Sequence, residues 1–460
     1  MTTNNAPARN PRLLSIDDLV GLIGAGDIDT VIVAYTDMQG RLQGKRLHAD
    51  YFRDEALKNG TEGCNYTLAT DVEMNTVDGY ALTSWDAGYG DMEFKLDFDT
   101  IRRLAHLPGT VMIQCDLIWA DGSPVRVSPR SVLAEQISRA NEHGWVPFAG
   151  TELEFIVFNT SFEDAWNSHY TQMTPSNQYN VDYSILGTTR VEPLIREIRN
   201  VMHAAGTVVE SAKGECNLGQ HEIGFQYTGA MATADNHSVY KNVAKEIAAH
   251  HGQSLTFMAK YNEREGSSCH VHMSLRGTDG SLVFWDKAAG QRSEIYDQFI
   301  AGILATMNDF TLLYAPNINS YKRFADGSFA PTTIGWGNDN RTCAVRLVGH
   351  GASARLENRL PGGDVNPYMT VAAMIAGGLY GVANELELEP ELTGNAYSSC
   401  HPHVPRTLRD ARDAFASSPI ARAAFGDDVV EHYVHAADTE LAAFDAAVTD
   451  WERHRGFERL

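Results

Sequence analysis

The N-terminal part of the chain shows a pattern of apolar and polar positions that predicts a small unit of strands and helices. Residues 31–37 read VIVAYTD, a run of β-branched and aromatic residues that is typical of a buried strand. A turn at MQG follows, and the next segment, RLQGKRL, completes the pattern of a β-hairpin. We expect this α+β unit to occupy residues 12–108.

A second and larger region is expected over residues 109–460, beginning with the apolar run GTVMIQCDLIW. The segment SPRSVLAEQISRANEHG then predicts a helix. Ser128 is placed to cap its N-terminus, Pro129 to occupy its first position and Gly144 to end it. The chain shows no internal repeat, so we expect this region to form one domain of helices and strands.

The remaining apolar periodicity predicts further helices. They are expected over residues 192–205 and 234–251, and the chain from about residue 385 onward is expected to be mainly helical. The longest apolar stretch, at 370–383, is too short to span a bilayer and is predicted to be a core helix. Residues 1–11 are expected to form a disordered tail.

Four strand-like segments carry charged or polar side chains where a buried strand would not. Side chains two apart on a strand point to the same face, so GTELEF places Glu152 and Glu154 side by side. In GECNLGQHEIGF, Glu215 and Glu222 flank a loop that contains glycine. The polar faces of GSSCHVHMSL and ARLENRL hold His270, His272 and Ser274, and Arg355, Glu357 and Arg359.

Each segment alone is explained by a half-exposed strand whose polar face meets water. Together they offer five glutamates and a histidine, and hard divalent cations prefer carboxylate oxygen with an occasional imidazole. Cysteine spacing typical of zinc is absent. The pattern therefore favours Mg²⁺ or Mn²⁺.

A basic segment near the end of the chain's strand-like motifs contains one of these acids, Glu357. Residues 322–360 hold six Lys or Arg against three acids, a local charge of +3 in an otherwise acidic chain. The six basic residues are Lys322, Arg323, Arg341, Arg346, Arg355 and Arg359. Because arginines bind phosphate and carboxylate bidentately, carboxylate-held metals beside arginines indicate phosphoryl transfer. The chain has no P-loop and no Rossmann glycine motif.

The overall composition excludes other functions. With 59 acidic and 37 basic residues, the chain carries a formal net charge of −22, which argues against nucleic acid as a partner. The six cysteines include no C-x-x-C pair, and the N-terminus lacks the apolar core of a secretory signal. We expect reduced thiols in a cytoplasmic protein that has no membrane partner.

These motifs and their order resemble the type I glutamine synthetase family. YTDMQGRLQGKRL is similar to the family's N-terminal β-grasp signature, and PRTLRDARDAF to its C-terminal helical region. Between them stand GTELEF, GECNLGQHEI, SLTFMAK, GSSCHVHMSL, NSYKRF, NRTCAVRL and ARLENRLPGGDVNPY. The resemblance covers nearly the whole chain. It implies a β-grasp domain followed by a catalytic domain with a curved antiparallel sheet and helices.

The resemblance also implies a role for each candidate residue. The ligands of one metal would be Glu154, Glu215 and Glu222. Those of a second metal, which holds the terminal phosphate of ATP, would be Glu152, His270 and Glu357. Contacts with glutamate would come from Arg323, Arg359 and the backbone of Gly266. Contacts with phosphate would come from Arg341, Arg346 and Arg355. The nucleotide-side positions would be Glu210, Tyr227, His272 and Ser274, with Tyr227 packing on adenine.

The reaction implied by the resemblance is an ATP-dependent ligation. The γ-carboxylate of L-glutamate attacks the γ-phosphate of ATP and forms γ-glutamyl phosphate. An unprotonated amine then displaces this phosphate and leaves an amide. The family also implies a homo-oligomer, a dodecamer of two hexameric rings, whose active sites form between the N-terminal domain of one subunit and the catalytic domain of its neighbour.

The sequence departs from the family at the two acids that hold ammonium. The aspartate of the F-D-G-S motif becomes Glu62 in TEGC, and the flap glutamate of G-x-E-A-P becomes Phe329 in DGSFAP. A compact ammonium ion needs acceptors and a base, whereas an aryl ring offers apolar area to an amine that carries carbon. We therefore predict that a primary alkylamine replaces ammonia.

Which amine is used stays open. A polyamine would favour several acids along its channel, and only Glu62 and Glu265 are candidates, so ethanolamine or another small monoamine is favoured over putrescine or spermidine. An ammonia-using glutamine synthetase and a non-catalytic homologue are further alternatives. Tyr397 lies near the tyrosine that some glutamine synthetases adenylylate, but its surroundings differ, and we interpret it as an ordinary loop tyrosine.

Overall fold

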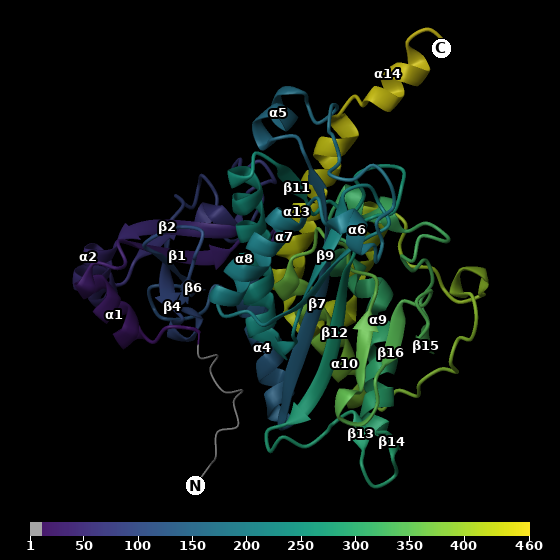
Figure 1. Cartoon of the computed structure of the whole chain (residues 1–460). Coiled ribbons are helices and arrows are strands. Elements are labelled where there is room, and N and C mark those ends of the chain that lie inside the picture. The colour runs from purple at the N-terminus through teal and green to yellow at the C-terminus, as the bar shows by residue number, and fades with distance from the viewer. Residues whose placement is uncertain (1–11) are drawn as a thin grey trace.

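The computed structural model describes residues 12–460, which form two units that lie side by side (Figure 1). The smaller, N-terminal unit is built on one sheet, and the larger unit on a second, longer sheet. The expected disordered tail, residues 1–11, lies outside the described residues. The expected α+β class, with a small unit before a large one, is confirmed.

The smaller unit contains a six-stranded sheet in the order β2-β1-β6-β4-β3, with β5 paired to β6. The predicted hairpin is present, because β1 and β2 pair in antiparallel fashion with Tyr35 opposite Gln43. The strands are β1 (Thr30–Thr36), β2 (Leu42–His48), β3 (Glu62–Cys64), β4 (Asp91–Leu96), β5 (Arg102–Arg103) and β6 (Thr110–Ile118). Its α-helices are α1 (Ile16–Ala25), α2 (Ala49–Tyr51) and α3 (Leu57–Asn59).

Strand β6 belongs to the smaller unit, whereas the sequence pattern placed it in the larger region. We expected residue 109 to begin the second region, but β6 pairs in parallel with β1, with Thr30 opposite Thr110. A parallel pair joins segments separated by a long crossover, and a local apolar run does not reveal its partner. The smaller unit therefore extends through Ile118.

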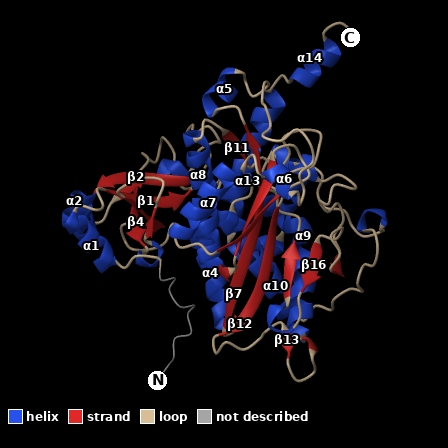
Figure 2. Ribbon diagram, viewed as in Figure 1, coloured by secondary structure: helices blue, strands red, loops and turns tan. Residues whose placement is uncertain are grey.

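The larger unit is built on a nine-stranded, mainly antiparallel sheet in the order β15-β16-β17-β12-β7-β9-β8, with β10 and β11 also paired to β7. Helices lie behind this sheet in Figure 2, and its other face is turned to the viewer. The long strands at its centre are β7 (Trp145–Phe158) and β12 (Cys269–Gly277). The others are β8 (Val209–Gly214), β9 (Gln220–Phe225), β10 (Thr228–Gly229), β11 (Ser254–Thr256), β15 (Trp336–Asn338), β16 (Val345–Val348) and β17 (Arg355–Asn358). A separate hairpin joins β13 (Trp285–Asp286) to β14 (Gln291–Arg292).

The predicted helices of the larger unit are confirmed within a few residues. Pro129 begins α4 as expected, and Ser128 stands at its N-cap position, although the Ser128 hydroxyl makes no capping bond. These helices are α4 (Pro129–Glu142), α7 (Glu192–Ala204), α8 (Ala230–His250) and α10 (Pro367–Ala383). The apolar stretch at 370–383 falls in α10, which is buried against α9 (Glu294–Tyr314). Two short helices, α5 (Phe162–Asn167) and α6 (Ile185–Thr188), lie in the irregular segment after β7.

The C-terminal part is helical only from Leu408 onward, later than the pattern indicated. Between residues 385 and 407 the structure has irregular chain and one 3₁₀ turn, Ala396–Ser398. The helices are α11 (Leu408–Ser417), α12 (Pro419–Phe425), α13 (Asp427–Ala446) and α14 (Asp450–Gly456). Helix α14 extends away from the body of the molecule (Figure 1). From residue 12 to residue 460, no helix has both the length and the apolar character that crossing a membrane requires.

A buried charge network holds the two units together. Arg130 at the start of α4 donates to Asp97 and Asp116 of the smaller unit and to Asp235 of α8. The hydroxyl of Tyr368 on α10 lies 2.7 Å from Asp235 Oδ1. A buried arginine that contacts three carboxylates is costly to disrupt, because each carboxylate would lose its counter-charge. The smaller unit is therefore held firmly against the larger one.

Candidate active site

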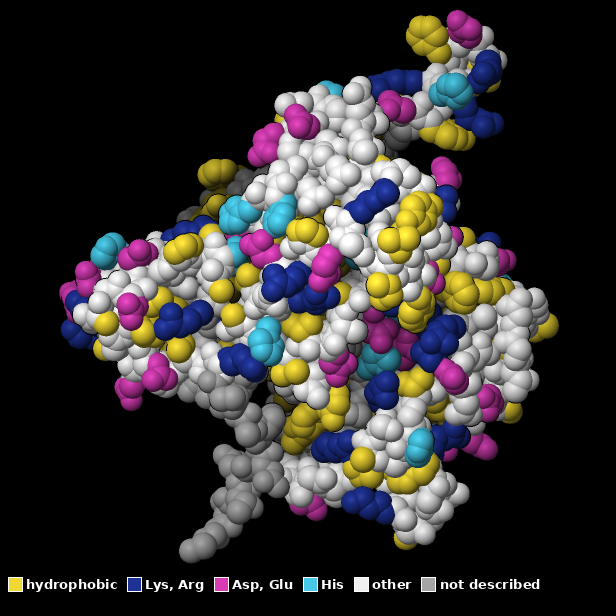
Figure 3. All heavy atoms as spheres, in the orientation of Figure 1, with side chains coloured by type: hydrophobic (Ala, Val, Ile, Leu, Met, Phe, Trp, Pro, Cys, Tyr) yellow, Lys and Arg dark blue, Asp and Glu magenta, His cyan; other side chains and the backbone are white. Residues whose placement is uncertain are grey.

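The face of the large sheet seen in Figure 3 has a recess in which acidic and histidine side chains lie deep. Lysine and arginine side chains lie along the right and lower edges of this recess in the view of Figure 3. Its floor is formed by strands β7, β9, β12 and β17, and these strands carry the polar alternation noted in the sequence. Strand register thus brings together acids that are far apart along the chain.

A first cluster combines glutamates from three segments. Glu154 on β7 stands directly opposite Glu222 on β9, and Glu215 follows the end of β8. One carboxylate oxygen from each residue lies within 4.8 Å of the other two. Glu154 is buried, and its Oε2 accepts hydrogen bonds from Gln220 Nε2 at 3.0 Å and from the backbone N–H of Ser268 at 2.8 Å. The sequence-predicted first set of metal ligands is therefore brought together.

The carboxylates of this first cluster repel one another. Burial and the adjacent Glu215 raise the pKa of Glu154 to about 8. Burial and the charges of Glu152, Glu154 and Glu215 raise the pKa of Glu222. Burial also raises the pKa of Glu215, although Lys213 opposes this effect. A divalent cation would relieve the repulsion, and an all-oxygen donor set fits Mg²⁺ or Mn²⁺.

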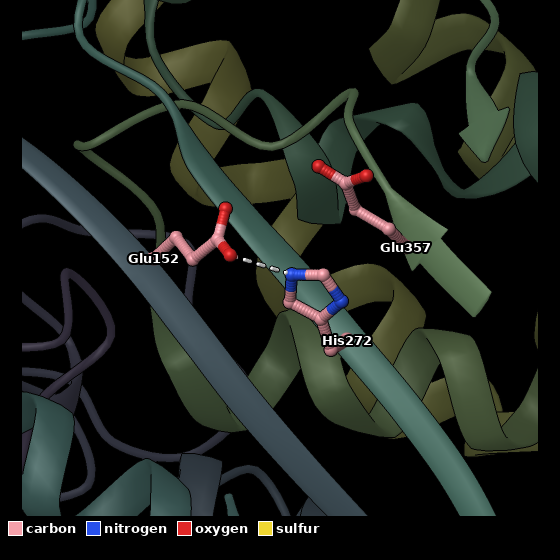
Figure 4. A group of neighbouring side chains, drawn as sticks. All are labelled: Glu152, His272 and Glu357. Carbon is pink, nitrogen blue, oxygen red and sulfur yellow. Dashed lines mark hydrogen bonds and ion pairs between the residues drawn. The ribbon is translucent and has the colours of Figure 1, made fainter. Parts of the chain in front are cut away.

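A second cluster lies beside the first and contains Glu152, His272 and Glu357 (Figure 4). In the strand register His270 stands opposite Glu152, and His272 stands opposite Glu357. His272 Nε2 lies 2.9 Å from Glu152 Oε1. His270 Nδ1 lies 3.4 Å from Glu152 Oε2 and 3.5 Å from Glu357 Oε1. The sequence motif placed only His270 in this set, whereas the structure brings both histidines to it.

The carboxylates of this second cluster already have positive partners. Arg359 Nη1 donates to Glu357 Oε1 at 2.5 Å, and Arg346 Nη1 donates to Glu357 Oε2 at 2.9 Å. Burial alone would raise the pKa of Glu357, but His270, Arg359 and His272 lower it below its usual value. The pKa of Glu152 is lowered as well, because hydrogen bonds with the two histidines outweigh burial. Glu152 and Glu357 are therefore held as anions.

Two buried arginines beside the clusters retain free donors. Arg323 is 2% exposed, and its Nε and Nη1 have no hydrogen-bond partner. The Nε of Arg359 is likewise buried without a partner. A Cβ on Gly266 would lie 2.6 Å from Arg323 Cγ, so only glycine leaves room for this side chain. Unpartnered guanidinium nitrogens fit a carboxylate ligand, which agrees with the predicted contacts to glutamate.

The remaining predicted residues belong to neither cluster. Arg341 is exposed, and Arg355 Nη1 donates to the carbonyl of Ser353 at 3.2 Å. Tyr227 is 52% exposed and packs edge-to-face on Phe148. The other three predicted positions are Glu210 in β8, Glu265 in the loop before β12, and Ser274 in β12.

Two residues predicted to hold the amine do not join either cluster. Glu62 begins β3 in the smaller unit and is exposed. Phe329 lies in the flap, which we define as residues 326–334, and its side chain is 56% exposed. The backbone of Phe329 has φ of 59°, in the left-handed region that bulky residues rarely adopt. The two residues thus lie on different units of the chain.

The structure also shows residues that sequence reasoning missed. Asp182, Glu215 and Cys216 offer ligand atoms within 4.8 Å of one another. Lys213 Nζ contacts Glu215 and lies 3.1 Å from Asp182 Oδ1. Cys216 is adjacent to a predicted ligand and could have been found from the motif. Asp182 lies in an irregular segment with no periodic pattern, so no sequence signal pointed to it.

The fold and this site fit the class of metal-dependent enzymes that transfer a phosphoryl group. Residues 126–456 match the family model described as glutamine synthetase, catalytic domain. The chain belongs to the glutamine synthetase family. This confirms the resemblance and the catalytic domain expected from the motifs. Ligases of this family generally use ATP and divalent metal ions, with glutamate and an amine as substrates.

Two relatives are named for amines that are larger than ammonia. The chain is 59% identical over 447 residues to γ-glutamylethanolamide synthetase GlnA4 of Streptomyces coelicolor, covering 97% of this chain and 96% of that protein. It is 37% identical over 436 residues to a glutamate–isopropylamine ligase of a Pseudomonas species, covering 93% and 95%. A solved structure of GmaS with ADP matches with a TM-score of 0.84 and 25% identity, covering 96% of this chain and 99% of that one.

Proposed function

We propose that this chain is an ATP-dependent ligase that joins the γ-carboxylate of L-glutamate to a primary alkylamine. The products are a γ-glutamylamide, ADP and phosphate, and ethanolamine or another small monoamine is the favoured amine. The observation that carries this proposal is the meeting of two carboxylate clusters and two incompletely paired arginines on one sheet face. Similarity to ligases named for ethanolamine and isopropylamine supports the choice of amine.

Each acid cluster would hold one Mg²⁺ or Mn²⁺ ion. The first ion would be held by Glu154, Glu215 and Glu222, and the second by Glu152 and Glu357 with His270 or His272. Held there, the ions would neutralise the charge that develops during phosphoryl transfer. The raised pKa values of the first cluster support this assignment, because a cation would favour the ionised carboxylates.

In this proposal, two arginines bind glutamate and three others bind phosphate. Arg323 and Arg359, with the backbone of Gly266, hold glutamate so that its γ-carboxylate faces the γ-phosphate of ATP. Positioning reactants in this way converts a bimolecular step into an effectively unimolecular one. The phosphate contacts are Arg341, Arg346 and Arg355, and the nucleotide-side residues are Glu210, Tyr227, His272 and Ser274.

The amine step depends on the flap and on a neighbouring subunit. Phe329 would present its ring to the carbon chain of the amine, while Glu62 of the next subunit and Glu265 would accept from its nitrogen. Glu62 and Phe329 lie on different units, which agrees with a site shared between subunits. We infer a dodecamer of two hexameric rings. The six free cysteines agree with a reducing, cytoplasmic compartment.

Phosphate release in a panel of amines tests this proposal. The protein is supplied with ATP, Mg²⁺, L-glutamate and one of ammonium, methylamine, ethanolamine, putrescine or spermidine. We expect ethanolamine or methylamine to give the highest kcat/KM. A clear preference for ammonium would identify an ammonia-using glutamine synthetase, and a preference for putrescine or spermidine would identify a polyamine ligase. No phosphate release with any amine would favour a non-catalytic homologue.

A flap variant tests the role given to Phe329. Phe329→Glu restores a carboxylate at this position, and charged hydrogen bonds contribute about 1.5–3 kcal/mol. We therefore expect kcat/KM for ammonium, relative to ethanolamine, to rise at least about tenfold. Phe329→Leu is the matched control, because it keeps an apolar side chain and should leave ammonium a poor substrate. An unchanged ratio in the glutamate variant would remove Phe329 from the amine site.

A further inference from the structure

The segment at residues 392–404, here called the strap, runs between the flap and the loop that carries Arg341. At the centre of the strap, the hydroxyl of Tyr397 donates to the backbone carbonyl of Ala330 at 3.1 Å. Ala330 is 2% exposed and directly follows Phe329 in the flap. The phenol of Tyr397 thus contacts the flap at the residue next to its aromatic side chain.

Other hydrogen bonds join the strap to the flap further along. Thr333 Oγ1 donates to the carbonyl of Ala396 at 3.2 Å, and the backbone N–H of Val404 donates to the carbonyl of Thr332 at 3.1 Å. His403 Nδ1 lies 3.0 Å from that same Thr332 carbonyl. These bonds hold the C-terminal half of the flap. Within the tip, Ser328 Oγ donates to the carbonyl of Ala325 at 2.6 Å and accepts from the backbone N–H of Ala330 at 3.4 Å, and Tyr397 joins this tip to the strap.

The strap is also joined to the phosphate-side loop. The backbone N–H of Ala396 donates to Thr342 Oγ1 at 3.0 Å, and Asn340 Nδ2 donates to the carbonyl of Gly394 at 2.8 Å. Arg341 lies between these two loop residues. One strap therefore contacts both the flap and the loop that carries a proposed phosphate ligand.

The conformation of the flap tip explains why an anchor is needed there. Phe329 has φ of 59°, and a bulky L-residue is strained in that region unless the surrounding structure holds it. Its ring is 56% exposed and so has little packing of its own in this chain.

We propose that Tyr397 is a positioning residue for the amine step. Its hydroxyl fixes the turn at Phe329 and Ala330, and this holds the aryl ring where the incoming amine enters. Tyr397 acts through the flap and touches no substrate. The inference rests on the proposed function only in giving Phe329 a role toward the amine. The proposal gives Tyr397 a role beyond that of the ordinary loop tyrosine expected from the sequence.

The variant Tyr397→Phe tests the proposal because it removes the hydroxyl and keeps the ring. Tyr433→Phe is the matched control, since the hydroxyl of Tyr433 on α13 also donates to a backbone carbonyl, that of Val127 in the segment before α4. We expect KM for ethanolamine to rise about 3–10-fold in Tyr397→Phe, because this change corresponds to the loss of one ordinary hydrogen bond. The KM values for ATP and glutamate should match those of the control variant.

A double-mutant cycle separates positioning from a merely structural role. Phe329→Ala should raise KM for ethanolamine, and adding Tyr397→Phe should then have little further effect, because the anchored ring is already gone. Additive effects on this KM would overturn the proposal. Equal rises in the KM values for ATP, glutamate and amine would overturn it as well, since they would indicate general loosening of the site.

Amide hydrogen exchange tests the anchor independently of the amine. In the full-length oligomer, Tyr397→Phe should speed exchange in residues 327–334, and Tyr433→Phe should leave these residues unchanged. Unchanged exchange in Tyr397→Phe would contradict the anchor. If exchange rises while Phe329→Ala leaves KM for every amine unchanged, the anchor stands and the role of Phe329 toward the amine is wrong.

Discussion

The two acid clusters lie on neighbouring strands of one sheet, yet their charges are balanced in different ways. In the first cluster, Glu154 and Glu222 face each other with raised pKa values. In the second, Glu357 is fully buried between Arg346 and Arg359 and has a lowered pKa. The first cluster has one lysine, Lys213, beside Glu215, whereas in the second cluster two arginines donate directly to Glu357.

This difference shows that burial alone does not determine the protonation of a carboxylate. Glu154 and Glu357 are both buried, but only Glu357 has arginine partners within hydrogen-bond distance. A buried carboxylate with partners stays ionised, whereas one beside other carboxylates holds its proton. The first cluster therefore depends on a bound cation more strongly than the second, and substitutions in the two clusters should have opposite effects on stability.

The largest effect on stability is expected from a substitution in the second cluster. Glu357→Gln leaves Arg359, which is almost fully buried, without its carboxylate, and breaking a buried pair costs about 3–5 kcal/mol. We expect the free energy of unfolding in EDTA, measured by urea denaturation, to fall by about 3 kcal/mol. Glu93→Gln, at an exposed position in β4, is the control and should change it little. A loss below about 1 kcal/mol would show that the arginines do not depend on Glu357.

The corresponding substitution in the first cluster should have the opposite effect on the free energy of unfolding. Glu222→Gln removes a carboxylate that is repelled by its neighbours, so the metal-free protein should become more stable by about 1 kcal/mol. Ligase activity should nevertheless fall more than about 100-fold, because loss of a metal ligand exceeds the effect of losing a supporting residue. Lower stability in EDTA would mean that Glu222 is already paired with a cation of the protein.

The next largest effect concerns pH. The pH dependence of the free energy of unfolding, measured without metal, should distinguish the two clusters. The pKa of Glu154 is raised to about 8, so the folded protein binds more protons than the unfolded chain between about pH 4.5 and 8. Stability in EDTA should therefore fall as the pH rises through this window, by up to about 1.4 kcal/mol per unit for one proton. Glu154→Gln should reduce this slope, and the raised pKa values of Glu215 and Glu222 should account for the slope that remains. An equal slope in that variant would show that another group is responsible.

The smallest expected effect concerns Lys213, the cation that contacts the first cluster through Glu215. Lys213→Met should lower metal-free stability by about 1 kcal/mol and enlarge the stabilisation that added Mn²⁺ provides. Thermal unfolding with and without Mn²⁺ measures both changes. Lys287→Met, at an exposed position, is the control. If Lys213→Met gains no more from Mn²⁺ than wild type, Lys213 does not substitute for the metal ion.

Much of the site could be predicted because strand periodicity fixes which side chains share a face. The alternation in GTELEF and GSSCHVHMSL placed Glu152 and His270 on polar faces, and the register sets them opposite each other. Periodicity does not say which neighbouring strand pairs with which. This is why β6 was assigned to the wrong unit and why the sequence did not show that His272 also reaches Glu152.

Residues outside periodic elements were the hardest to predict. Asp182 and Tyr397 lie in irregular segments, and their partners, Lys213 and Ala330, are separated from them by 31 and 67 positions. Only the folded chain brings such pairs together. The chain from about residue 385 onward is mainly helical as expected, but residues 385–407 are an exception, because their hydrogen bonds go to the flap and to the Arg341 loop.

The most direct test of the two-cluster account is an equilibrium titration with Mn²⁺ that counts ions per chain. Wild type should bind two ions at the clusters, Glu222→Gln should lose the first, and Glu357→Gln should lose the second. The first ion should bind more weakly as the pH falls below about 8, because the proton on Glu154 competes with it. Two ions retained by Glu222→Gln, or a single ion bound by wild type, would contradict the account.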